Sequence, residues 1–297
     1  MRIVVTGTKG QLAQSLLASA TADISLIAVG RLSLDFERLQ SIAPALAAAN
    51  PDVIVNAAAY TAVDQAETEE QRAFRINATA AGAVAAAAKK LGVPVIHLST
   101  DYVFDGNASV PYRESDATSP LNAYGRSKLA GESNVATAHT DHVILRTSWV
   151  YSPFGQNFVR TMLRLSESRD TINVVADQYG SPTSAPDLAR VIVAIARRLC
   201  ESPDDAALRG TFHATGSGET NWTEFARAIF DEATARGRNR VNVVPITAAE
   251  YPTAAARPKN SRLNCDKLAQ VYDLRLPDWR ASTRACVAQL LDGASTQ

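Results

Sequence analysis

Short apolar runs alternate with longer alanine-rich stretches through the first half of the chain. The stretches, of which Glu69 to Leu91 is one, place larger apolar side chains among alanines, as helices that pack closely on a sheet do. Such alternation is typical of βαβ units. Right-handed crossovers then give a doubly wound parallel sheet with its ligand crevice at the carboxyl ends of the strands. The expected strands run from Ile3 to Thr6, Leu26 to Val29, Val53 to Asn56, Val95 to Ser99 and Val143 to Thr147.

The pattern changes after about Trp149, where Pro and Gly become frequent and irregular connections separate the helix-like segments. These segments are Asn157 to Leu165, Asp187 to Leu199 and Trp222 to Arg236. We therefore expect an α/β, Rossmann-type fold in which residues 1–150 form a dinucleotide-binding domain. Residues 151–297 are expected to form mainly a smaller substrate-binding lobe, with some segments returning to the first domain.

The turn after the first expected strand has two glycines and an alanine at even spacing, Gly7-x-x-Gly10-x-x-Ala13, and opens a helix. Gly7 suits a tight turn, Gly10 lets the backbone approach a phosphate, and Ala13 allows the helix to pack close to the strand. Backbone N–H groups at a helix start attract a pyrophosphate. Two glycines also fit an ordinary strand-to-helix turn, but the position directly after the first strand favours a dinucleotide site.

The second expected strand ends in Val29-Gly30-Arg31, with no carboxylate there to bond the ribose hydroxyls of NAD. Arg31 instead suits the 2′-phosphate of NADPH, because guanidinium pairs with phosphate through parallel hydrogen bonds. The alternative is a solvated surface arginine. Asp35 and Phe36 follow where the adenine side of the cofactor would lie. NADPH is the expected cofactor, with NADH as an alternative.

Tyr124 and Lys128 are four residues apart at the start of an expected helix, so their side chains share one helical face. An ammonium near a phenol favours the phenolate, which suits Tyr124 to give and recover a proton during carbonyl reduction. Thr100 directly follows the fourth expected strand beside the crevice, where its hydroxyl can bond a substrate carbonyl oxygen. An ordinary strand end with a capping Thr is the alternative there.

Composition excludes several classes of partner. Thirty basic and thirty acidic residues give a formal net charge of zero, so no diffuse positive field exists to hold nucleic acid or anionic lipid. The three cysteines, Cys200, Cys265 and Cys286, lack metal-ligand spacing and are expected to be reduced. No charged leader and no apolar run of about 18 residues is present. We expect a cytoplasmic protein without nucleic-acid or membrane partners.

Seven motifs extend the pattern over nearly the whole chain: Asn56 to Asp64, Ser99 to Phe104, Ser119 to Gly125, Lys128 to Glu132, Arg146 to Tyr151, Asp177 to Thr183 and Arg257 to Asn264. Together they resemble the extended short-chain dehydrogenase/reductases, and within them the family of dTDP-4-dehydrorhamnose reductases. The resemblance implies NADPH-dependent reduction of the C4 keto group of dTDP-4-dehydro-L-rhamnose to give dTDP-L-rhamnose. The implied substrate is a small nucleotide sugar.

The resemblance also implies roles for single residues. Tyr124 would donate the proton, Lys128 would hold the nicotinamide ribose, and Thr100 would meet the sugar. The implied cofactor-binding residues, besides Gly7, Arg31, Tyr124 and Lys128, are Gly10, Gln11, Leu12, Asp35, Phe36, Ala58, Ala59 and Tyr60. The implied substrate-binding residues are Thr100, Asp101, Trp149, Asn157, Gln178, Arg257 and Arg262.

The chain departs from the family pattern where some members hold magnesium at a dimer interface with glutamates. The corresponding positions are Ser15, Pro186 and Gln289, none of which offers a carboxylate. We therefore expect no metal requirement and a monomer or weak homodimer. Ala13 also replaces the usual third glycine of the turn, which the dinucleotide fingerprint tolerates.

Two other functions remain open at this stage. One is a reductase or epimerase that acts on another nucleotide sugar, which cofactor consumption and product identity would distinguish. The other is a non-catalytic, NADP-binding regulatory subunit of the same fold. The presence of Thr100, Tyr124 and Lys128 argues against the second, because a protein that only binds has no evident need for an acid near the nicotinamide.

Overall fold

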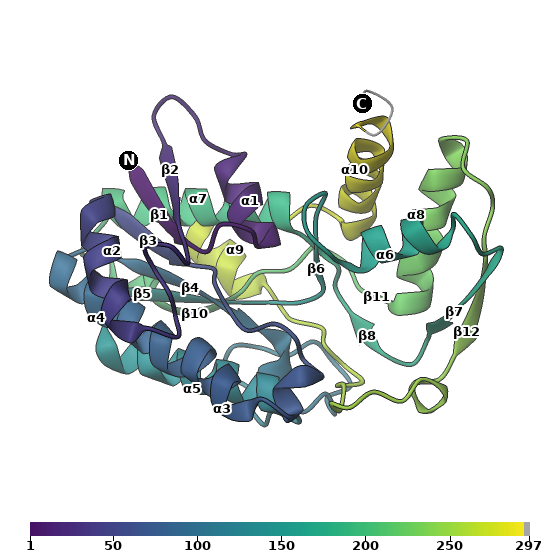
Figure 1. Cartoon of the computed structure of the whole chain (residues 1–297), viewed down its shortest axis with the longest axis horizontal. Coiled ribbons are helices and arrows are strands. Elements are labelled where there is room, and N and C mark those ends of the chain that lie inside the picture. Colours follow the sequence, from purple (N-terminus) through teal and green to yellow (C-terminus); the bar gives the residue numbers. More distant parts are fainter. Residues whose placement is uncertain (294–297) are drawn as a thin grey trace.

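The computed structural model describes residues 1–293, and its centre is a parallel sheet of six strands in the order β2-β1-β3-β4-β5-β10 (Figure 1). The chain passes from β1 to β2, which pairs with one edge of β1, and then to β3, which pairs with the other edge of β1. This reversal places a topological switch point between the carboxyl ends of β1 and β3, where ligands bind in open α/β sheets. The strands are β1 (Arg2–Thr6), β2 (Ser25–Val29), β3 (Val53–Asn56), β4 (Val95–Thr100), β5 (His142–Thr147) and β10 (Gly210–His213).

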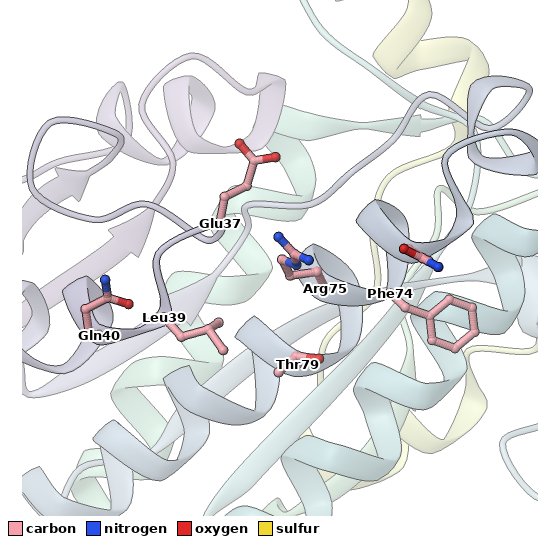
Figure 2. Close-up of a pocket in the computed structure, with 7 residues that line it drawn as sticks. Glu37, Leu39, Gln40, Phe74, Arg75 and Thr79 are labelled. Carbon is pink, nitrogen blue, oxygen red and sulfur yellow. The ribbon is translucent and has the colours of Figure 1, made fainter.

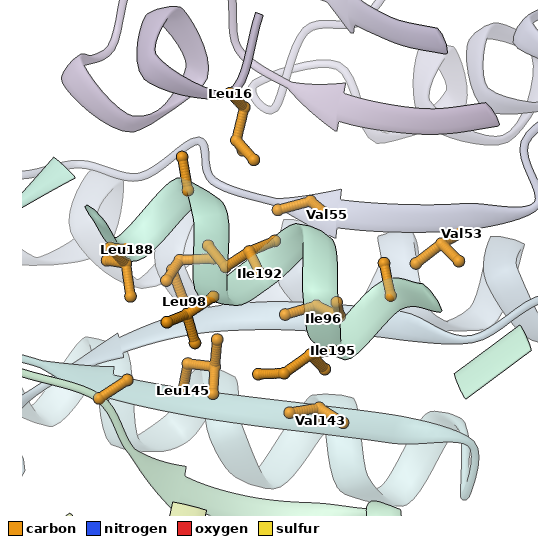
Figure 3. Packing of buried hydrophobic residues seen from close by; sticks show 14 of the residues in the cluster. Leu16, Val53, Val55, Ile96, Leu98, Val143, Leu145, Leu188, Ile192 and Ile195 are labelled. Carbon is orange, nitrogen blue, oxygen red and sulfur yellow. The ribbon is translucent and has the colours of Figure 1, made fainter. Parts of the chain in front are cut away.

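Helices cover both faces of this sheet, because its central strands are apolar on both sides. Val55 and Leu98 face α7 (Ala185–Glu201) on one side, and Val4 and Ile54 face α2 and α4 on the other. Figure 3 shows Leu188, Ile192 and Ile195 of α7 lying over the side chains of β3, β4 and β5. Besides α7, the helices around the large sheet are α1 (Gln11–Leu17), α2 (Ile42–Ala49), α3 (Glu70–Phe74), α4 (Ala80–Leu91), α5 (Ala123–Ala138) and α9 (Asp266–Tyr272).

A second, smaller core lies beside the sheet, at the right of Figure 1. Its centre is aromatic: Phe225 of α8 packs against Tyr151 at 5.3 Å and Trp279 at 5.8 Å between ring centroids. The elements of this lobe are β6 (Val150–Tyr151), α6 (Phe158–Leu165), β7 (Thr171–Val175), β8 (Tyr179–Gly180), β9 (Thr183–Ser184), β11 (Thr220–Asn221), α8 (Trp222–Ala235), β12 (Asn242–Ile246) and α10 (Trp279–Asp292).

The expected doubly wound α/β fold is confirmed, and the five expected strands match the observed ones to within one residue at each end. The sixth strand, β10, was not expected. It pairs in parallel with β5, and α7 and α9 from the same half of the chain also pack on the large sheet. Several segments beyond residue 150 therefore return to the first core. The exact division at residue 150 stays a prediction.

The long helix expected from Glu69 to Leu91 is interrupted by a π-helical turn at Arg75–Thr79. Asn77 explains the irregularity, because its side-chain amide bonds the backbone N–H and C=O of Tyr60 and the hydroxyl of Ser127. The backbone carbonyl oxygen of Asn77 also lies so close to Gly131 that a Cβ on this glycine would come within 2.1 Å of that oxygen. Short π turns of this kind are frequent near functional sites.

None of the helices in residues 1–293 combines the length and the apolar character that a membrane span needs.

Candidate active site

A cavity of about 1030 Å³ lies at the carboxyl edge of the sheet, between the turn after β1, the segment after β2, the end of β3 and helix α5. It reaches from the dinucleotide turn to Tyr124 and Lys128, so it joins the two regions that the sequence analysis singled out. Of the expected cofactor residues, its walls contain Gly7, Gly10, Gln11, Leu12, Arg31, Asp35, Phe36, Ala58, Ala59, Tyr124 and Lys128. Tyr60 is outside these walls, although its neighbours Ala59 and Thr61 are part of them.

The turn after β1 has the backbone that a dinucleotide needs. Gly7 has a φ of +89°, which side chains rarely adopt, and its N–H donates to the Val29 carbonyl at 2.7 Å. A Cβ on Gly10 would meet no atom within 4 Å, so this glycine faces open space in the cavity. The Thr6 hydroxyl bonds Asn56 across the switch point at 2.8 Å and fixes the two strand ends to each other. The cavity and turn fit a nicotinamide dinucleotide.

Two cations at the mouth of this cavity have no partner among the described residues, 1–293. Arg31 is exposed and forms no ion pair or hydrogen bond among residues 1–293, and the Lys9 ammonium is equally without one. The turns that carry them touch, since a Cβ on Gly30 would come within 2.9 Å of the Thr8 methyl group. Sequence reasoning identified Arg31 and missed Lys9. The signal for Lys9 was available in the sequence, because this residue lies between Gly7 and Gly10 in the expected phosphate-binding turn.

A second pocket of about 630 Å³ adjoins the first, because Glu37 lines both. Figure 2 shows its residues, which come from the segment around Leu39 and from the helical stretch that carries Phe74, Arg75 and Thr79. Glu37 is bound there to Arg72 by an ion pair of 2.8 Å. None of the expected site residues lies in this pocket, so the larger cavity is the candidate site.

Helix α5 positions Tyr124, Lys128 and Glu132 one turn apart on a common face. It begins at Asn122, whose side-chain oxygen accepts the Gly125 N–H at 2.8 Å. The Lys128 ammonium is buried and donates to the Leu98 carbonyl at 2.5 Å. Burial lowers the pKa of Lys128 to about 8, although the carboxylate of Glu132 opposes that shift. Lys128 therefore loses its charge near the upper end of the physiological range.

Burial raises the pKa of the Tyr124 phenol well above its usual value, and the charge of Asp101 raises it further. A hydrogen-bonding interaction with the Thr100 hydroxyl acts in the opposite direction. The expectation that Lys128 lowers this pKa is wrong for the structure described here, because desolvation dominates and the Lys128 ammonium is bonded to Leu98. Tyr124 is therefore held in its protonated form, the form that a proton donor needs.

Thr100 ends β4 and Asp101 follows it, beside Tyr124 but outside the walls of the dinucleotide cavity. The Thr100 hydroxyl donates to the Asp101 carboxylate at 2.9 Å and accepts the Tyr102 N–H at 3.2 Å. Burial raises the pKa of Asp101 to about 6, while its interactions with Ser261 and Thr100 oppose that shift. The ring of Tyr102 meets the ring of Tyr124 edge-on, with 5.8 Å between centroids. The structure thus brings together three expected site residues, Thr100, Asp101 and Tyr124.

The other expected substrate residues are held by the second lobe and its connections. Trp149, with a φ of +48°, stacks on Trp222 with 3.6 Å between ring centroids. Arg257 pairs with Asp64 at 2.7 Å, and Arg262 pairs with Glu219 at 3.0 Å. Asn157 caps α6 through Arg160 N–H, and its amide donates to the Ser152 and Phe154 carbonyls. Gln178 lies partly buried before β8. Contact of these side chains with substrate stays a prediction.

A buried ion pair behind the site was missed by sequence reasoning. Arg146 donates two hydrogen bonds to Glu132, at 2.9 and 2.7 Å, and the Ser99 hydroxyl donates to the same carboxylate at 2.5 Å. Both charged side chains are only 6% exposed. This network fixes α5 against β4 and β5, and it keeps a negative charge one helical turn from Lys128.

The positions considered for a metal do not form a carboxylate cluster. Ser15 is buried on α1, Pro186 is the second residue of α7 and Gln289 is exposed on α10. Across residues 1–293, no group of three or more His, Cys, Asp or Glu side chains is arranged to hold a metal ion. The expectation that activity needs no metal stays a prediction.

Known proteins resemble this chain over its full length. Residues 1–291 match the family described as RmlD substrate binding domain. A dTDP-4-dehydrorhamnose reductase of Sinorhizobium fredii is 53% identical over 297 residues, 99% of each chain, and one of Escherichia coli K12 is 44% identical over 98% of each. The crystal structure of dTDP-4-dehydrorhamnose reductase from Bacillus anthracis in complex with NADP is 37% identical, with a TM-score of 0.89 over 97% of this chain and 99% of that one.

Proposed function

We infer the function from the premise that this chain belongs to the RmlD substrate binding domain family, that of the dTDP-4-dehydrorhamnose reductases. The chain is accordingly an NADPH-dependent oxidoreductase that reduces the C4 keto group of dTDP-4-dehydro-L-rhamnose to give dTDP-L-rhamnose. The relative of known structure bound to NADP supports this choice of cofactor, as does the cavity at the switch point.

When bound, NADPH supplies the hydride for the sugar carbonyl. The chain's own residues supply the rest of the chemistry. Tyr124, protonated because it is buried, donates a proton to the nascent alkoxide. The Thr100 hydroxyl donates a hydrogen bond to the same oxygen once it turns from the Asp101 carboxylate, to which it donates in the structure. The Lys128 ammonium holds the nicotinamide ribose, so that one buried face of α5 orients both the cofactor and the acid.

One observation carries this proposal: Tyr124 lies in the wall of the dinucleotide cavity and also interacts with Thr100 at the end of β4. A protein that only binds NADPH needs no acid at that position. The test is to incubate the protein with NADPH and a panel of 4-keto-6-deoxy nucleotide sugars. Loss of NADPH absorbance with formation of dTDP-L-rhamnose supports the assignment. Tight NADPH binding without reduction of any sugar would favour a regulatory subunit instead.

NADPH should be preferred over NADH, because Arg31 and Lys9 line the cavity and neither cation is paired within the described part of the chain. Arg31→Ala should weaken kcat/KM for NADPH about tenfold or more and change that for NADH little, since only NADPH has the 2′-phosphate. Steady-state kinetics with both cofactors measure this. Arg284→Ala, which removes an exposed arginine of α10, is the control. An equal loss with both cofactors would remove the phosphate argument.

Activity should fall as the pH rises through about 8, because the Lys128 ammonium loses its proton there and with it the charge that holds the ribose. The profile of kcat/KM for NADPH reports this group in the free enzyme. Lys128→Met should raise KM for NADPH and lower kcat. It should also abolish the limb of the pH profile near pH 8, that is, the fall in kcat/KM with rising pH. Lys90→Met, at an exposed position near the end of α4, should leave the profile unchanged. A wild-type profile in Lys128→Met would assign the limb to another group.

Magnesium should be dispensable for activity and assembly, because Ser15, Pro186 and Gln289 supply no carboxylate. Size-exclusion chromatography and initial rates, each with EDTA and with added magnesium, check this. We expect the same elution volume and the same rate in both. A magnesium-dependent shift from monomer to dimer would show that other residues hold the ion.

A further inference from the structure

The segment from Ala255 to Arg262, here called the strap, crosses from the second lobe back to the large sheet. In Figure 1 it belongs to the yellow-green connection between β12 and α9. It has little regular structure, so bonds to other parts of the chain hold it in place. Two of these lie at its beginning, where Ala255 N–H and the Arg257 guanidinium both donate to the Asp64 carboxylate, at 3.0 and 2.7 Å.

The far end of the strap is fixed as well. Asn260 donates to the Ala108 and Val110 carbonyls at 2.8 and 2.9 Å, and Ser261 N–H donates to the Tyr179 carbonyl at 2.7 Å. Pro258 lies so close to Gly106 that a Cβ on this glycine, whose φ is +75°, would come within 2.5 Å. The strap is therefore seated on the loop that follows Asp101 to Val103.

This placement brings the strap against the groups that lie beside Tyr124. The Ser261 hydroxyl interacts with the Asp101 carboxyl. Burial raises the pKa of Tyr102, whose ring contacts Tyr124, and the nearby charge of Arg257 opposes that rise. A small movement of the strap would change the groups that face the sugar. It would leave the dinucleotide cavity intact, because no residue of the strap lines that cavity.

Asn122 joins the strap to the catalytic helix. Its side-chain oxygen accepts the Gly125 N–H, a group that can only donate, so the orientation of the amide is fixed. The amide nitrogen then donates to the Ala256 carbonyl at 2.8 Å. Asn122 is 1% exposed, so its amide nitrogen has no solvent to donate to in place of the Ala256 carbonyl. Capping alone needs only an acceptor, which Ser184 and Asp205 provide at other helices of this chain.

We propose that Asn122 is a positioning residue that ties the strap to the first turn of α5 and so sets the substrate side of the site against Tyr124. Through one amide it couples the connection between the lobes to the helix that carries the proton donor. The proposal rests on the proposed function for its kinetic consequence. Its structural consequence, a strap that loosens when the amide donor is lost, is independent of any substrate.

Asn122→Ser tests the proposal, because serine keeps the cap and removes the donor to Ala256. We expect KM for the keto-sugar to rise roughly three- to tenfold, as for the loss of one buried hydrogen bond, with the dissociation constant for NADPH and the melting temperature nearly unchanged. Asn122→Asp keeps the oxygen that caps α5 but replaces the amide nitrogen with a second oxygen. This oxygen would repel the Ala256 carbonyl, so the substitution should raise KM at least as much. Asn221→Ser, at the partly buried cap of α8, is the matched control and should leave KM unchanged.

Hydrogen exchange followed by mass spectrometry provides the readout that needs no substrate. In Asn122→Ser the strap amides should exchange faster, while those in the middle of α5 keep their wild-type rates. Wild-type KM and wild-type exchange in the strap for both Asn122 variants would overturn the proposal, as would an equal rise of KM in Asn221→Ser. If the wild-type protein reduced no keto-sugar, the proposed function would fail, and the exchange data alone would still decide the role of Asn122.

Discussion

Tyr124→Phe should lose turnover by about 10²–10⁴-fold, which corresponds to roughly 3–5 kcal/mol in the activation barrier. The substitution removes one hydroxyl and little volume, so the fold and the cavity should persist. Tyr124 is buried among groups that keep it protonated, and no other protonated phenol lines the dinucleotide cavity among residues 1–293. The variant should therefore bind NADPH and keto-sugar nearly as the wild type does.

Single-turnover and steady-state rates measure this loss, and NADPH fluorescence titration measures binding. Tyr272→Phe is a suitable control, since its hydroxyl bonds the Leu208 carbonyl at the opposite end of the molecule's first core and has no part in the cavity. Turnover of Tyr124→Phe at the wild-type rate would mean that another group supplies the proton. A loss of NADPH binding that accounts for the whole effect would make Tyr124 a cofactor ligand only.

Glu132→Gln should destabilise the protein by about 3–5 kcal/mol, because it leaves the buried Arg146 guanidinium without a compensating charge. The volume hardly changes, so packing contributes little to the loss. Removing the same carboxylate should also lower the pKa of Lys128 further below about 8, since Glu132 is the charge that opposes its desolvation. The variant should then show a pH limb at lower pH than the wild type.

Urea denaturation measures the free energy of unfolding, and the slope m should stay unchanged if only the folded state is affected. Glu70→Gln is the matched control: its partner Arg126 is equally close, at 2.8 Å, but both side chains are more than 40% exposed. That substitution should cost no more than about 1 kcal/mol. Equal effects for the two variants would show that the burial of the Arg146 pair does not govern its contribution.

The strands of the large sheet could be predicted from the sequence because central parallel strands are continuously apolar. Ile3 to Val5 in β1 and Val53 to Val55 in β3 have this signature, and the order of the strands along the chain follows from the βαβ alternation. β10 could not be predicted in the same way. It is a short edge strand, Gly-Thr-Phe-His, and only its pairing with β5 makes it a strand. The π turn at Asn77 likewise depends on contacts with Tyr60 and Ser127, which are distant in the sequence.

Much of the candidate site could also be predicted, since its residues lie at strand ends and on one helical face. Lys9 lies in the turn between β1 and α1, and its position was also readable from the sequence, but it was not predicted. The ion pairs of Arg257 and Arg146 were beyond prediction, because their partners Asp64 and Glu132 are recognisable only once the chain has folded. The pKa of Tyr124 was predicted with the wrong sign for a related reason: a sequence shows the charge of Lys128 but not the depth at which the phenol is buried.

The central claim is that the chain transfers hydride from NADPH to C4 of a nucleotide-linked keto-sugar. NADPH deuterated at C4 of the nicotinamide tests it most directly when it is incubated with the protein and dTDP-4-dehydro-L-rhamnose. The product is then analysed by mass spectrometry and NMR. The account predicts dTDP-L-rhamnose that carries one deuterium, at C4 of the sugar, for each NADPH consumed. A sugar product without deuterium at C4, or cofactor that stays unconsumed while the sugar changes, would contradict it.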